Sequence, residues 1–68
     1  MFTEVRCNFF DEGIWYVDAW LTDDNDEEGF VVATINEKTF EVHYINDMYK
    51  TNNMVLDAVK EKLRELVK

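Results

Sequence analysis

Five carboxylates lie within eight consecutive residues, 22–29, whose sequence is TDDNDEEG. Such a run could bind calcium through its oxygen atoms or attract a basic partner protein. The calcium loop D-x-[DN]-x-[DN]-G-x5-E matches only in its first half, because the position of its bidentate glutamate is Ile35. We therefore expect a hydrated loop between two strands, with weak calcium binding as the alternative. Its acidic residues, here called the acidic segment, are Asp23, Asp24, Asp26, Glu27 and Glu28.

The other residues that could carry chemistry do not form a metal or catalytic motif. The one histidine, His43, and the one cysteine, Cys7, fall on opposite faces of the sheet expected below, whereas a zinc or nucleophilic site needs them together. The two glycines, Gly13 and Gly29, lie sixteen residues apart and provide no phosphate-binding loop. We therefore predict a protein with no metal, no cofactor and no enzymatic activity, in which Cys7 acts as a small buried hydrophobic residue.

Length and composition are typical of one small packed domain. The chain has 68 residues, of which 47% are hydrophobic and ten are Phe, Trp or Tyr, too apolar for a disordered tail. A core this small contributes roughly 3–5 kcal/mol of net stability, so oligomerisation is an open alternative to a monomer. One cysteine excludes an intrachain disulfide, and no targeting sequence or membrane span is evident. We expect a single domain, 1–68, located in the cytoplasm.

Charge is distributed unevenly along the chain. Residues 1–49 carry twelve acidic side chains against Arg6 and Lys38, a net charge of −10, and residues 50–68 carry five basic against three acidic, a net charge of +2. The sum is −8. Because phosphate repels such a surface, we expect neither direct nucleic-acid binding nor binding to an anionic membrane. A basic partner remains compatible with it.

Four apolar runs with a period of two predict four strands, at about residues 2–10, 14–21, 30–36 and 39–45. A three-residue loop, 11–13, would close the first hairpin with Gly13 in the left-handed conformation, and would place Arg6 opposite Asp18 as an ion pair. A two-residue loop, 37–38, would close the last hairpin. The expected pairs are Phe10–Ile14, Phe9–Trp15, Cys7–Val17, Val5–Ala19, Ile35–Phe40, Ala33–Val42 and Val31–Tyr44. The side chains expected to face the core are Thr3, Val5, Cys7, Phe9, Trp15, Val17, Ala19, Leu21, Val31, Ala33, Ile35, Phe40, Val42 and Tyr44.

The period changes after Asp47 and predicts one helix over about residues 52–67. Apolar residues recur at helical spacing through Val55, Val59, Leu63 and Leu66, and basic residues gather towards the C-terminal end, as the helix dipole favours. Thr51, Asn52 and Asn53 are all suitable N-caps. The expected fold is α+β: a four-stranded antiparallel meander with a C-terminal helix packed on one face.

One helix covers one face, so the other face should be open to solvent or to a partner. The expected register places eight large apolar residues there, more than a small monomer usually exposes. Partial burial by loops is the simpler explanation, and RNA stacking on the aromatic rings is disfavoured by the acidic surroundings. The apolar residues expected on this face are Phe2, Phe10, Ile14, Tyr16, Trp20, Phe30, Val32 and Ile45, of which Ile14, Tyr16, Trp20, Phe30, Val32 and Ile45 are the predicted partner-binding residues.

Two functional hypotheses follow. In the first, the protein is a non-enzymatic interaction module that forms a homodimer or binds another protein through the aromatic face. In the second, the acidic segment imitates nucleic-acid phosphates and inhibits a nucleic-acid-binding protein. The first depends on apolar burial and should survive high salt, whereas the second should be sensitive to salt.

Overall fold

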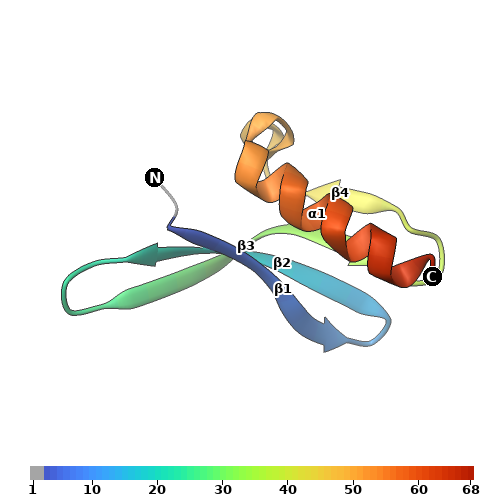
Figure 1. The fold of residues 1–68 in the computed structure, drawn as a ribbon, viewed down its shortest axis with the longest axis horizontal. Coiled ribbons are helices and arrows are strands. Elements are labelled where there is room, and N and C mark those ends of the chain that lie inside the picture. Colours follow the sequence, from blue (N-terminus) through green and yellow to red (C-terminus); the bar gives the residue numbers. More distant parts are fainter. Residues whose placement is uncertain (1–2) are drawn as a thin grey trace.

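The computed structural model describes residues 3–68, which form a four-stranded antiparallel sheet followed by two helices (Figure 1). The predicted α+β meander with one C-terminal α-helix is confirmed. Phe2, expected at the start of the first strand and on the open face, lies outside the described residues. The elements are β1 (Glu4–Asp11), β2 (Ile14–Thr22), β3 (Glu27–Asn36), β4 (Val42–Tyr44), the 3-10 helix η1 (Asp47–Thr51) and α1 (Asn53–Leu66), with the strands side by side in chain order.

The first hairpin closes with a two-residue loop, not the expected three-residue loop. Glu12 and Gly13 have φ angles of 49° and 81°, the left-handed conformation that a type I′ turn needs at both positions. As a result Phe10 opposes Trp15 and Phe9 opposes Tyr16, so the predicted partners of both phenylalanines were wrong. A β-bulge between Arg6 and Phe9 absorbs the extra residue and replaces the expected Cys7–Val17 pair. Beyond it the predicted pairs Val5–Ala19 and Arg6–Asp18 are confirmed.

A second bulge reverses the alternation within β3. Val17 pairs with Ala33 but Asp18 pairs with Val31, so Val32 is the extra residue. Val32 is fully buried, and Phe30 packs against the core. Both had been expected on the open face, and Val31 had been expected to face the core, so these three placements were wrong.

The β3–β4 connection is also longer than expected. Asn36 organises it: its side chain accepts hydrogen bonds from the amides of Lys38 and Thr39, and Phe40 adopts a φ of 64°. The strands therefore pair Ile35 with Val42 and Ala33 with Tyr44, so all three expected pairs were wrong. Because the shift is two residues, Val42 and Tyr44 still face the core, as predicted. Phe40 does not, because it lies exposed in the loop.

Two asparagines start the helices. The side chain of Asn46 caps η1 by accepting from the amide of Met48, and that of Asn52 caps α1 by accepting from the amides of Met54 and Val55 at 3.0 and 3.2 Å. The helix spans 53–66, within one residue of the predicted bounds at each end. The short η1 was not expected.

The core is small for the surface that surrounds it. The accessible surface is 4999 Å², against about 4,500 Å² for an average monomer of this mass, and the molecule is elongated, 38 × 23 × 20 Å. Much of the length comes from the β2–β3 hairpin, whose end projects away from α1 (Figure 1). Within residues 3–68, no helix combines the length and apolarity needed to cross a membrane. The buried core consists of Val17, Ala19, Val32, Ala33, Ile35, Val55 and Val59.

Candidate protein-interaction surface

The sheet has one face without a helix, here called the open face. Alternate residues of β2, Val17 and Ala19, join Val55 and Val59 of α1 in the core, so the residues between them point to the other side. Cross-strand pairing places side chains of all four strands on that side. The open face comprises Glu4, Arg6, Phe9, Ile14, Tyr16, Asp18, Trp20, Val31, Thr34 and His43.

The apolar centre of the open face consists of the ring pair Phe9 and Tyr16 and of Val31, which lies in another cross-strand row, opposite Asp18. The rings of Phe9 and Tyr16 lie 5.4 Å apart between centroids, with an angle of 48° between their planes. The exposed fraction is 57% for Phe9 and 37% for Val31, whereas Tyr16 is half-buried. Two neighbouring rings hold each other in place, so they present apolar surface with little conformational freedom left to lose on binding.

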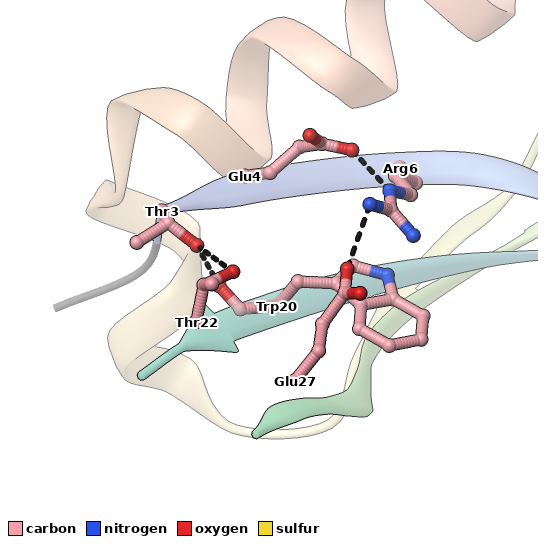
Figure 2. A network of polar contacts seen from close by, with 6 residues as sticks. All are labelled: Thr3, Glu4, Arg6, Trp20, Thr22 and Glu27. Atoms are coloured by element: carbon pink, nitrogen blue, oxygen red, sulfur yellow. Dashed lines mark hydrogen bonds and ion pairs between the residues drawn. The ribbon is translucent and has the colours of Figure 1, made fainter. Parts of the chain in front are cut away.

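One end of the open face is closed by a polar network around Trp20 (Figure 2). The guanidinium of Arg6 lies 4.5 Å from the centroid of the Trp20 ring, and it donates hydrogen bonds to Glu4 and, at 2.9 Å, to Glu27. Thr3 adds a bond from its hydroxyl to the carbonyl oxygen of Trp20, at 3.0 Å. Trp20 is therefore held under a charged layer and is less accessible than Phe9.

The expected Arg6–Asp18 ion pair is not formed, although the two residues oppose each other in the sheet. Arg6 turns instead towards Glu4 and Glu27, which β3 brings within reach because it begins at Glu27, three residues before the predicted start. Burial raises the pKa of the Asp18 carboxyl above its usual value. Asp18 thus remains an acidic group with reduced hydration beside the apolar centre.

The predicted partner-binding residues are only partly brought together. Ile14, Tyr16 and Trp20 lie on the open face, and Ile45 follows β4 with 56% of its surface exposed. Phe30 and Val32 are removed from it by the bulge in β3. Sequence reasoning missed Phe9, because Glu12-Gly13 is not the Asn-Gly or Asp-Gly pair that usually signals a two-residue turn.

Phe10 belongs to a second aromatic cluster, on the face that α1 covers. Its ring lies 4.9 Å from that of Trp15, whose Nε1 donates to Glu37 at 3.1 Å. The ammonium of Lys62 lies 3.9 Å from the centroid of the Trp15 ring and bonds Glu65 at 2.8 Å, which lowers the pKa of the Glu65 carboxyl. Together these contacts fix the C-terminal half of α1 on the sheet.

Cys7 and His43 are far from forming a site. Cys7 is on β1 and His43 on β4, at opposite edges of the sheet. Burial raises the pKa of the Cys7 thiol to about 11. Among residues 3–68, no three His, Cys, Asp or Glu side chains converge in a way that could hold a metal ion.

The acidic segment lies at the projecting end of the β2–β3 hairpin, where a loop was predicted. Residues 23–26 form the connection, closed by a bond from the Asp23 amide to the Asp26 carbonyl at 2.8 Å. Glu27 and Glu28 already belong to β3. Residues 22–29 are exposed throughout.

The geometry of the open face and of the acidic segment is the basis for assigning a function to this chain. Comparisons with protein-family models, with curated proteins and with solved structures found no match to this chain.

Proposed function

We propose that this protein is a non-enzymatic interaction module that binds another protein chain through its open face, centred on Phe9, Tyr16 and Val31. The observation that carries the proposal is the exposure of this apolar centre on a sheet whose other face alone is covered by a helix. Aromatic residues buried at the middle of an interface contribute much of its binding energy. Burying the exposed part of Phe9 would therefore favour association.

The surroundings of this centre suit a specific contact. Thr34 and His43 offer hydrogen-bonding groups on the neighbouring strands, and Asp18 carries negative charge. An apolar centre with polar groups around it is the usual composition of a protein interface. Cys7, the one thiol, suits a reducing compartment, so we place the protein in the cytoplasm as part of this proposal.

The partner is either a second copy or a different protein, and one pair of variants tests both. Phe9→Ser removes the most exposed ring of the open face, and Val67→Ser removes a side chain of similar exposure, 65%, at the end of α1. Sedimentation at several concentrations measures self-association, and affinity capture from the source cells measures other partners. We expect the Phe9 variant alone to lose association. An unchanged monomer that captures the same proteins with both variants would contradict the proposal.

A second candidate function is the phosphate-imitating inhibitor. It is favoured by the position of the acidic segment at the projecting end of a hairpin, where its residues are exposed, although Glu27 is paired with Arg6. Replacing all five carboxylates by amides should then abolish binding of a basic partner, and moderate salt should weaken binding by the unmodified protein. If the partner still binds after the five substitutions and in moderate salt, the open face is the binding surface instead.

A further inference from the structure

A groove runs between β1 and α1, and it borders the open face at Glu4 and Arg6. Two hollows of about 310 and 450 Å³ lie between β1 and α1, and they share Val5, Ala58 and Glu61 as lining residues. The first extends towards Cys7 and the second towards Met54. The hollows are therefore neighbouring parts of one open groove, here called the β1–α1 groove.

One wall of the groove is β1, an edge strand of the sheet. β1 is at the end of the sheet, with β2 as its strand neighbour in the part of the chain that the structure describes, and it is eight residues long against three for β4. The outward backbone groups of an edge strand can pair with an added strand. Alternate side chains of that strand would lie about 7 Å apart and point to the same side, which suits two adjacent hollows.

The charges along the groove favour a basic occupant. Glu4, Asp57, Glu61 and Glu65 line it, against Arg6 and Lys62, a net charge of −2. Both cations are already engaged, Arg6 with two carboxylates and Lys62 with Glu65 and the Trp15 ring. Asp57 has no ion pair within residues 3–68, and Glu61 approaches Arg64 only at 3.8 Å between exposed side chains. Glu4 and Glu65 are thus compensated by these cations, and the uncompensated acidic charge of the groove is that of Asp57 and, in large part, of Glu61.

We propose that the β1–α1 groove binds an extended basic segment of a partner protein, which pairs with β1 as a fifth strand. Every second residue of the segment faces α1: two apolar residues among them enter the hollows, and Lys or Arg residues on the same side meet Asp57 and Glu61. A second copy of this chain is a poor occupant, because its own Asp57 and Glu61 would approach the same residues and each chain carries a net charge of −8.

The test uses the full chain, labelled with ¹⁵N, and an eight-residue peptide with blocked ends, Lys-Thr-Val-Thr-Val-Thr-Lys-Thr, whose lysines and valines all lie on one side when it is extended. Amide chemical shifts measured during titration locate the binding site and its affinity. We expect saturable shifts at residues 4–7 and 54–65. The control peptide has the same side chains with every backbone nitrogen methylated, so it keeps its charge but donates no backbone hydrogen bond.

Variants test the two parts of the groove separately. Ala58→Met should fill the junction of the hollows and weaken binding about tenfold, a loss of about 1.4 kcal/mol. The double variant Asp57→Asn, Glu61→Gln should also weaken binding without changing the hollows. Glu41→Gln, an exposed carboxylate outside the groove, should leave binding unchanged. Unaltered shifts of the core residues Val17 and Ile35 would show that each variant is folded.

Three results would overturn the proposal. The first is equal binding by the methylated peptide, and the second is a set of shifts confined to the acidic segment, because either would mean attraction by charge without strand pairing. The third is the absence of peptide-dependent shifts at residues 4–7, and if the β1 shifts then depend on protein concentration, the occupant is a second copy. The Phe9→Ser variant should bind the peptide as well as the unmodified protein does. The proposals for the groove and for the open face can therefore be contradicted independently.

Discussion

Arg6 of β1 lies over the indole ring of Trp20 on β2, 4.5 Å from the ring centroid, and is held there by Glu4 and by Glu27 of β3 (Figure 2). The contact joins three strands at the end of the sheet farthest from the Glu12-Gly13 turn. It occupies one side of Trp20 and leaves Phe9 and Tyr16 as the accessible part of the open face.

Replacing Arg6 by methionine should therefore loosen this end of the sheet. The variant keeps a long apolar side chain but loses the charge and the fork of donors, so neither the contact with the ring nor the bonds to Glu4 and Glu27 can form. We expect a lower urea midpoint and stronger quenching of tryptophan fluorescence by acrylamide. Arg6→Lys, which keeps the charge, should give an intermediate result. Identical quenching in all three proteins would contradict the structural role given to Arg6.

Gly29 should not tolerate a side chain. A Cβ atom built there would lie 2.7 Å from the Trp20 ring, closer than any ordinary contact, and the ring is constrained by Arg6. Gly29→Ala should lower the free energy of unfolding by about 1–3 kcal/mol, as overpacking usually does. The same substitution in a Trp20→Leu background should cost much less. Equal costs in the two backgrounds, measured by urea unfolding, would show that the ring is not the cause.

The bulge in β3 predicts opposite behaviour for two adjacent valines. Val32 is fully buried and Val31 is 37% exposed. Val32→Ala should therefore cost roughly 1–3 kcal/mol of unfolding free energy, and Val31→Ala less than about 0.5 kcal/mol. A strand without the bulge would place Val31 in the core, and Val31→Ala would then lower the free energy of unfolding more than Val32→Ala. Urea unfolding of the two variants distinguishes these arrangements.

The Cys7 thiol should be slow to react and should make stability fall at alkaline pH. Its pKa is raised by burial to about 11 from 9.0, so unfolding releases a more acidic thiol. The associated stability is fully present below pH 9 and is lost as pH rises towards 11. Cys7→Ala should remove this part of the pH dependence. If the Cys7 thiol of the folded protein reacts with Ellman's reagent at pH 8 as fast as that of the unfolded chain, the raised pKa is contradicted.

The features predicted correctly are those that depend on long patterns. The helix was found because its apolar stripe repeats over about three turns with a cap at Asn52, and the strands because each alternates over several residues. The meander follows from short connections between consecutive strands. None of these depends on the position of a single residue.

The strand residues of β1 and β3 that were placed on the wrong face depend on one extra residue in each strand. Phe9 and Phe10 are identical, and Val31, Val32 and Ala33 are all apolar, so an extra residue can be inserted in either run without disturbing the apolar pattern. A one-residue shift moves every later side chain to the other face. That is why Phe9 was missed on the open face and why Phe30 and Val32 were placed there. The groove beside β1 was not predictable from the pattern, since it depends on how α1 lies against the edge strand.

Photo-crosslinking from position 9 tests the central claim most directly, because it reports what covers the open face. Phe9→p-benzoylphenylalanine places the reactive group in the apolar centre, and the same replacement at Val67 provides an equally exposed control. Irradiation in the source cells should give one defined adduct from position 9, either with a second copy or with another protein, and none of that mass from position 67. No adduct from position 9 beyond those from position 67 would contradict an interaction through the open face.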